Sequence, residues 1–161
     1  MPGVGKSTVG VLLAKRLALA FLDTDILIQT GERRSLQQII TGGGIEKFCD
    51  LEAEYMTSLA CPGTVIATGG SVVYRNLAMA HLARLGTVVY LRIESAALRQ
   101  RLDDIDARGV VYAPGQDLSG LYEERAPLYG RYAQITVDCD GLTPDHVVGV
   151  IIAAINAYPA K

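Results

Sequence analysis

The chain contains 161 residues, 50% of them hydrophobic, and its formal net charge is −2 at pH 7. This length predicts one domain with one sizeable core, and the charge, without a Lys/Arg-rich run, argues against a nucleic-acid surface. The three cysteines show no CxxC spacing, which argues against a disulfide framework or a zinc site. The apolar C-terminal stretch is shorter than the ~20 residues of a membrane span. We therefore expect a cytoplasmic monomer whose partners are small molecules or protein, and neither nucleic acid nor a membrane.

The chain begins with MPGVGKSTVG, in which Gly5, Lys6 and Ser7 match the end of the pattern Gly-x4-Gly-Lys-[Ser/Thr]. In α/β nucleotide-binding proteins this pattern links a buried strand to a helix, and its backbone N–H groups surround phosphates. The segment VGVLLAKRLAL that follows has the apolar spacing of a helix, as the motif requires. A chance match is the alternative. The pattern's first glycine would precede Met1, so we expect a β-strand of about ten residues upstream of the printed sequence.

Four short β-branched or apolar runs alternate with longer stretches of helical spacing. The strands are predicted at 21–25, 64–70, 86–93 and 133–140. The helices are predicted at 7–19, 46–60, 76–85, 95–104, 118–133 and 144–157, and TGGG at 41–44 is interpreted as a break between two helices. Nearly continuous apolar strands are typical of parallel sheets that are buried on both faces. The alternation predicts an α/β fold with a doubly wound parallel sheet and helices on both faces.

Two further stretches are candidate sites. In LDTD, Asp23 and Asp25 alternate along an extended segment, which would direct one carboxylate toward a metal and the other toward an acceptor hydroxyl. The alternative for these aspartates is capping of the helix that follows. In ATGGS, Gly69 and Gly70 predict a close approach of the backbone to another group, with an ordinary strand-to-helix turn as the alternative.

Together these segments resemble the shikimate kinase family across nearly all of the chain. The resemblance is carried by GVGKSTVGVLLAKRL, FLDTDILIQTGERRSLQQII, GIEKFCDLEAE, VIATGGSVV, LRQRL and YEERAPLYGRYAQITVD. It implies a single P-loop kinase domain over residues 1–161 with the strand order 2-3-1-4-5. It also implies transfer of the γ-phosphoryl group of ATP, bound with Mg²⁺, to the 3-hydroxyl of shikimate.

The resemblance also implies roles for individual residues on the nucleotide side. The phosphates would be bound by Gly3, Val4, Gly5, Lys6, Ser7 and Thr8. Ser7 would bind Mg²⁺ directly, and Asp23 would bind a water on the metal. Arg101 would lie near the adenine, and Arg108 would belong to a lid at about residues 105–118 and contact the nucleotide. A solvated surface position is the alternative for both arginines.

On the acceptor side, the resemblance implies that Asp25 binds the acceptor hydroxyls and that Gly69 and Gly70 line the pocket. Arg125 would pair with the shikimate carboxylate. Lys6 and Arg108 would neutralise the migrating phosphoryl group, while Asp25 would orient the attacking hydroxyl. These three residues are the expected catalytic set.

Three positions depart from the family pattern. Cys49 stands where the family has one of two arginines that bind the acceptor carboxylate, and such a charge-assisted bond is worth roughly 1.5 to 3 kcal/mol. Gly109 replaces a proline at the lid, and Ser71 replaces the third pocket glycine. A kinase for another small hydroxy acid or polyol, or a non-catalytic nucleotide-binding module, therefore stays open as an alternative function.

The order 2-3-1-4-5 would place the first strand between the strands predicted at 64–70 and 86–93. Without it, a slot about 10 Å wide would separate them, because neighbouring strands lie ~4.8 Å apart. Unpaired ladder groups on both sides would each cost about 1 to 3 kcal/mol if they were buried. We therefore expect the printed chain to be poorly soluble or weakly stable, or to be completed by a strand from a partner.

Overall fold

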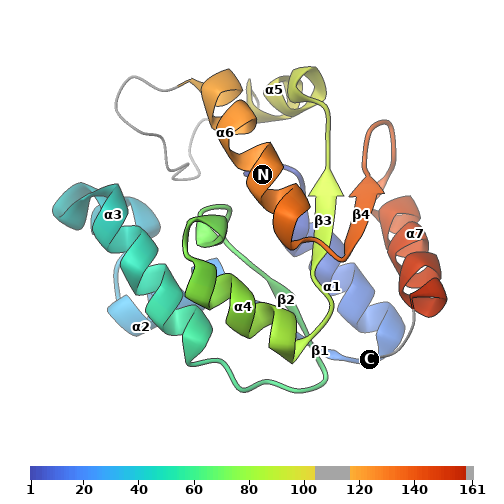
Figure 1. Cartoon of the computed structure of the whole chain (residues 1–161), viewed down its shortest axis with the longest axis horizontal. Helices are drawn as coiled ribbons and strands as arrows, with labels where there is room; N and C mark the ends of the chain where they lie inside the picture. The colour runs from blue at the N-terminus through green and yellow to red at the C-terminus, as the bar shows by residue number, and fades with distance from the viewer. Residues whose placement is uncertain (104–116, 159–161) are drawn as a thin grey trace.

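The computed structural model describes residues 1–103 and 117–158, with the backbone alone for residues 100–103 (Figure 1). Within these ranges the protein is an α/β fold, mostly helical, with parallel strands. Its helices are α1 (Lys6–Leu17), α2 (Thr24–Glu32), α3 (Leu36–Thr57), α4 (Asn76–Leu85), α5 (Ser95–Asp103), α6 (Leu118–Tyr132) and α7 (Pro144–Ala157). A short 3-10 helix, η1, spans Val72–Tyr74, and the strands are β1 (Ala20–Asp23), β2 (Thr64–Ala67), β3 (Val89–Arg92) and β4 (Ile135–Asp138).

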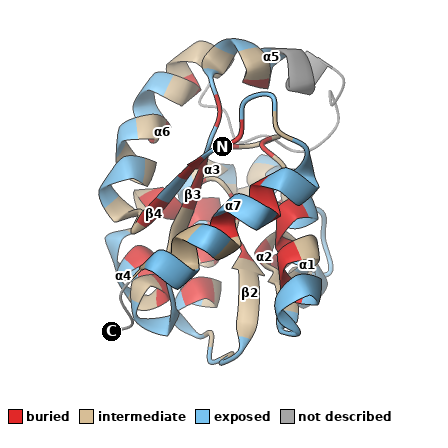
Figure 2. Ribbon diagram, turned by 90° about the vertical axis from the view of Figure 1, so that its right-hand side faces the viewer, coloured by how far each residue is buried: buried red, intermediate tan, exposed pale blue. Residues whose placement is uncertain are grey.

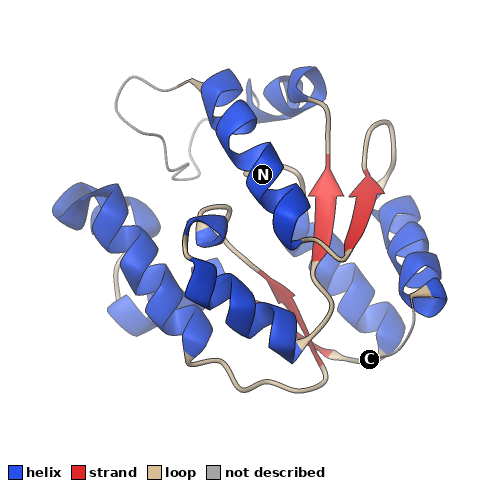
Figure 3. Cartoon of the chain, viewed as in Figure 1, coloured by secondary structure: helices blue, strands red, loops and turns tan. Residues whose placement is uncertain are grey.

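The strands form two separate parallel pairs in the described part of the chain (Figure 3). β1 pairs with β2, with Ala20 opposite Thr64, and β3 pairs with β4, with Val89 opposite Ile135. β2 and β3 therefore each have one strand neighbour, and the space between them divides the sheet.

Local sequence signals account for most helix boundaries. Thr143 caps α7, since its hydroxyl accepts the backbone N–H of His146, and Pro144 occupies the first turn, where it needs no N–H partner. Ser35 caps α3 in a reciprocal capping box with Gln38. Gly44 interrupts that helix with φ 82° and ψ 167°, which confirms the predicted break at TGGG.

The core consists of three groups of buried residues. Figure 2 shows in red where buried residues lie along the ribbon. The largest joins the N-terminal loop and α1 to β3, β4 and α7. A second lies among α3, η1 and α4, and a third joins α2 to α3. No helix in residues 1–103 and 117–158 is both long enough and apolar enough to span a bilayer.

The strands are shorter than the sequence predicts. In particular, residues 24 and 25 are helical and not extended, and residues 68–70 form a loop beyond β2. The prediction for 21–25 is wrong after Asp23 because the Asp23 carboxylate caps α2. Its Oδ1 accepts the backbone N–H groups of Asp25 at 3.0 Å and Ile26 at 3.4 Å, so the helix begins at Thr24.

Candidate active site

The N-terminal loop leads directly into α1, as a phosphate-binding loop does. Gly3 and Gly5 have φ angles of 72° and 99°, in the left-handed region that favours glycine. Gly5 is the N-cap of α1, and its carbonyl accepts the backbone N–H of Val9 at 2.8 Å. The first N–H groups of a helix have no intrahelical partner, and the helix dipole favours an anion there. The loop can therefore bind a phosphate group through its backbone.

Lys6 is partly buried at the start of α1, and its Nζ donates a hydrogen bond to the Met1 carbonyl at 2.6 Å. Burial lowers the pKa of this ammonium group, while the nearby Asp25 carboxylate raises it. Ser7 and Thr8 are exposed in the first turn of the helix. The loop thus presents a cation and two hydroxyl groups beside its backbone N–H groups.

Asp25 lies in the first turn of α2, next to the loop that follows β2. Its Oδ1 is buried and accepts no hydrogen bond from the described residues. Burial raises the pKa of this carboxyl group, whereas Lys6 lowers it and Asp23 raises it. The structure therefore brings Asp25 and Lys6 close enough to influence each other's protonation.

Gly69 makes the close backbone approach that the sequence predicts. Its N–H donates to the hydroxyl of the buried Thr24 at 3.1 Å. A Cβ atom at Gly69 would lie 2.2 Å from Glu52 Oε1 and 2.9 Å from Asp25 Oδ1, so no other residue fits there without displacing these carboxylates. Gly69 thus lies beside one carboxylate oxygen of Glu52 and one of Asp25.

Arg125 reaches the same loop from α6, and its side chain is 2% exposed. Its Nε donates to the Tyr74 hydroxyl at 2.8 Å, and its guanidinium carbon lies 4.9 Å from the centre of the Tyr74 ring. A Cβ atom at Gly70 would lie 3.1 Å from Arg125 Nη1. The Tyr129 hydroxyl donates to the Gly70 carbonyl at 2.7 Å, which fixes this loop against α6.

Glu52, on α3, belongs to the site although the sequence reasoning did not single it out. It is 1% exposed, and its Oε2 accepts the Ser71 hydroxyl at 2.7 Å, while Oε1 accepts nothing from the described residues. Burial raises its pKa to about 7, with a further increase from Asp25, against the Ser71 hydrogen bond and the positive charges of Arg125 and Lys6. Its position four residues after the buried Phe48 was an available signal, because that spacing places a charge on the apolar stripe of the helix.

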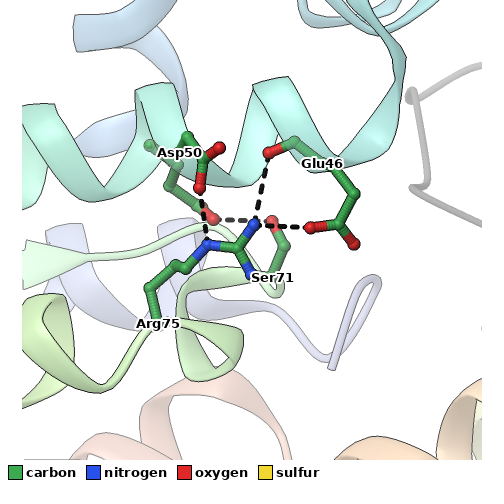
Figure 4. A network of polar contacts seen from close by, with 5 residues as sticks. Glu46, Asp50, Ser71 and Arg75 are labelled. Carbon is green, nitrogen blue, oxygen red and sulfur yellow. Dashed lines mark hydrogen bonds and ion pairs between the residues drawn. The ribbon is translucent and has the colours of Figure 1, made fainter.

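Cys49, which replaces an expected arginine, is 1% exposed on α3. Burial, reinforced by Glu52, raises the pKa of its thiol to about 11, so it is uncharged at neutral pH. Beside it, Arg75 forms ion pairs with Glu46 at 2.7 Å and Asp50 at 2.8 Å (Figure 4). Position 49 therefore supplies no positive charge to the site, and Arg75 joins the segment after η1 to α3.

For two of the expected nucleotide contacts, the structure does not describe the side chain. Arg101 falls within α5, but its side chain is not described, and Arg108 lies in residues 104–116. Nearly all of the predicted lid, about 105–118, falls in the same range, and its last two residues are the N-cap and first residue of α6. Their roles stay predictions.

A profile of the family described as "Shikimate kinase" matches residues 2–156, which is almost the whole chain. The chain belongs to the shikimate kinase family. Enzymes of this family are ATP-dependent phosphotransferases.

Individual relatives agree with this membership. The shikimate kinase of Thermodesulfovibrio yellowstonii is 35% identical over 154 residues, which cover 93% of this chain and 88% of the relative. Shikimate kinase 2 of Enterobacter sp. (strain 638) is 35% identical over 159 residues, which cover 96% of this chain and 91% of the relative.

Solved shikimate kinase structures share the fold. The enzyme from Acinetobacter baumannii, in complex with shikimate, superposes with a TM-score of 0.86 at 29% identity, over 99% of this chain and 90% of that one. The enzyme from Aquifex aeolicus superposes with a TM-score of 0.83 at 31% identity, over 98% of this chain and 93% of that one.

Proposed function

We propose that this protein is a shikimate kinase that transfers the γ-phosphoryl group of ATP to a hydroxyl of shikimate. The observation that supports this most directly is the convergence of three features on the loop at residues 68–70. A phosphate-binding loop at a helix N-terminus, two carboxylates that each have a buried oxygen, and a buried arginine all meet there. A reaction between a nucleotide phosphate and a hydroxylated carboxylic acid needs each of these groups.

On the nucleotide side, the residues from Gly3 to Thr8 bind the phosphates in this proposal. Ser7 and Asp23 fit Mg²⁺, because this ion keeps several waters and usually takes one or two carboxylates together with phosphate oxygens. Ser7 is exposed, and Asp23 uses a single oxygen, Oδ1, for both of its capping hydrogen bonds. When bound, the metal neutralises charge on the β and γ phosphates.

On the acceptor side, Asp25 and Glu52 bind the hydroxyl groups. Buried polar atoms in native proteins nearly always have a hydrogen-bond partner, and Asp25 Oδ1 and Glu52 Oε1 have none among the described residues. Hydroxyl donors of an acceptor molecule would satisfy both oxygens. Arg125 then pairs with the acceptor carboxylate, and the backbone at Gly69 and Gly70 forms the wall between these groups.

Catalysis by this chain depends mainly on positioning and charge. Lys6 is placed to neutralise the migrating phosphoryl group, and Arg108 is proposed to add a second positive charge from the lid. Asp25 orients the attacking hydroxyl and accepts its proton, a role that its raised pKa favours.

The finer description of the fold belongs to the same proposal. The pairs β1–β2 and β3–β4 support a doubly wound sheet of order 2-3-1-4-5. This order counts the expected upstream strand as strand 1, so that β1 to β4 are strands 2 to 5 and the upstream strand lies between β2 and β3. We further propose one domain over residues 1–161 with a lid at about 105–118, a monomeric state and a cytoplasmic location.

Cys49 favours a second candidate, a kinase for a different small hydroxy acid or polyol. A neutral buried thiol cannot pair with a carboxylate, so an acceptor without that group would lose less affinity here than shikimate does. The change Cys49→Arg separates the two candidates. It should tighten binding of shikimate if shikimate is the substrate, and it should abolish activity on a different acceptor.

The test is a coupled ADP-release assay across a panel of hydroxy acids and polyols. If shikimate is the substrate, Arg125→Ala should raise its KM steeply, and Asp25→Asn should lower kcat with little effect on the KM for ATP. Arg131→Ala is the matched control for Arg125, because Arg131 is exposed on the same helix. Turnover of no acceptor in the panel, combined with tight ATP binding, would instead identify a nucleotide-binding module.

Lys6→Ala tests the nucleotide site separately. It should weaken binding of MgATP in calorimetry, whereas Lys15→Ala, an exposed change on the same helix, should not. Unchanged affinity in the Lys6 variant would remove the loop from the proposal.

A further inference from the structure

Residues 69–71, which precede η1, are hydrogen-bonded to three different helices. Gly69 and Gly70 use backbone groups, which bond to side chains of α2 and α6 at 3.1 and 2.7 Å. Ser71 uses its side chain instead, because its hydroxyl donates to Glu52 Oε2 on α3 at 2.7 Å (Figure 4). A substitution at Ser71 can therefore remove the bond to α3 and leave the two backbone bonds in place.

The Ser71 hydroxyl lies on a fixed and enclosed segment. Ser71 is the N-cap of η1, its carbonyl accepts the N–H of Tyr74 at 2.9 Å, and the residue is 3% exposed. An acceptor molecule therefore has little access to this hydroxyl. Any effect of Ser71 on the acceptor must pass through the group that it orients, which is the carboxyl group of Glu52.

The hydrogen bond makes the two oxygens of Glu52 different. Oε2 accepts from Ser71, whereas Oε1 is buried and accepts nothing from the described residues. Oε1 lies on the acceptor side, since a Cβ atom at Gly69 would be 2.2 Å from it and 2.9 Å from Asp25 Oδ1. The terminal torsion of a glutamate side chain is broad and roughly two-fold. By holding Oε2, Ser71 thus fixes the direction in which Oε1 points.

Two of the three departures from the family pattern meet at this carboxyl group. Ser71 is one, and Cys49, three residues before Glu52 on α3, is the other. Residues three apart on a helix are neighbours, and the negative charge of Glu52 contributes to the raised pKa of the Cys49 thiol. A thiol is only a weak hydrogen-bond donor. Ser71 therefore supplies Glu52 with a donor that position 49 does not supply.

We infer that Ser71 is a positioning residue for the acceptor, whose hydroxyl holds Glu52 with Oε1 toward an acceptor hydroxyl and does so in place of a charged side chain at position 49. The inference rests on the proposed function, because it assigns Ser71 a part in acceptor binding at that same site. Since Glu52 lies on the acceptor side, Ser71 affects the affinity for the acceptor and not the affinity for ATP.

The experiment measures kcat and the KM values for shikimate and ATP by coupled ADP release. Ser71→Ala should raise the KM for shikimate roughly tenfold, whereas kcat and the KM for ATP should stay within about twofold. Ser71→Thr keeps the hydroxyl and should stay within about threefold of the parent protein in all three constants. The matched control is Ser58→Ala, which removes an exposed hydroxyl that donates to the Tyr55 carbonyl at 2.8 Å, and it should change none of them.

A double-mutant cycle with Cys49→Arg tests whether Ser71 acts in place of a charge at position 49. In that background the new guanidinium can hold Glu52, so Ser71→Ala should raise the KM for shikimate by less than about threefold. An equal rise in both backgrounds would show that the two positions act independently and would overturn the inference. If Ser71→Thr or Cys49→Arg does not fold, the other comparison decides.

Thermal melting of each variant separates positioning from a contribution to stability alone. A lower melting temperature for Ser71→Ala with an unchanged KM for shikimate would assign the hydroxyl a purely structural role and would overturn the inference. An equal rise in the KM values for shikimate and ATP would mean a general disturbance of the fold and would overturn it as well. Failure of the proposed function looks different, because the parent protein itself would then not turn over shikimate, and the inference would fall with it.

Discussion

The buried carboxyl group of Glu52 should make the stability of this protein depend on pH in a defined direction. Burial raises its pKa from 4.5 to about 7 in the folded chain. Below about pH 4.5 the group is protonated in the folded and in the unfolded chain, so its burial does not lower the free energy of unfolding. As pH rises toward 7, the unfolded chain releases the proton while the folded chain must retain it, so stability is lost over this window. At 1.36 kcal/mol per pKa unit, the loss is about 3 kcal/mol above pH 7.

Glu52→Gln removes this titration and keeps the shape of the side chain. Its amide oxygen can still accept the Ser71 hydroxyl, so the main hydrogen bond is preserved. We expect the variant to equal the parent protein in stability near pH 4.5 and to exceed it by up to about 3 kcal/mol at pH 8. The control is Glu54→Gln, the same change at an exposed position of α3, which should show no such trend.

The measurement is urea unfolding of the parent protein and both variants at several pH values from 4.5 to 8, analysed for the free energy of unfolding. The test is whether the difference in free energy of unfolding between variant and parent changes with pH, since effects of the substitution on packing are independent of pH. A difference that stays constant across this range would refute the reasoning. So would an equal trend in the Glu54 control, because it would show that the effect is general and not due to burial of Glu52.

Four further predictions concern named positions. Gly69→Ala should destabilise the fold by about 1–3 kcal/mol in urea unfolding, because its Cβ would meet Glu52 Oε1 at 2.2 Å. Gly149→Ala, in open space on α7, should instead stabilise it by up to ~1 kcal/mol. Asp23→Ala removes the N-cap of α2, so it should lower the free energy of unfolding by about 0.5–2 kcal/mol and speed hydrogen exchange in the first turn of that helix. Unchanged exchange in that turn would contradict this prediction. Arg75→Ala should cost under ~1 kcal/mol despite two ion pairs, because both acidic partners are exposed, and a loss above 2 kcal/mol would contradict that view.

Local sequence patterns predict most of the helices and the phosphate-binding loop, although α2 is not among the predicted helices. The helices predicted at 76–85 and 144–157 have the bounds that the structure shows, and the break at 41–44 falls at Gly44. These features are local, because apolar periodicity, capping residues and glycine conformations act over a few neighbouring residues. The same holds for the cap at Asp23, because capping depends on an aspartate directly before a helix, and the structure contains this cap.

Tertiary structure decided which side chains share the site. Asp25, Glu52, Gly69 and Arg125 come from four separate segments, and their approach depends on how α2, α3, α6 and the loop after β2 pack. The buried state of Glu52 follows from that packing, since neighbours distant in sequence remove it from water and thereby raise its pKa. The pairing of β1 with β2 and of β3 with β4 has the same origin, because a strand's apolar sequence predicts that it will be buried, whereas the backbone that pairs with each of its edges is fixed only in the assembled sheet.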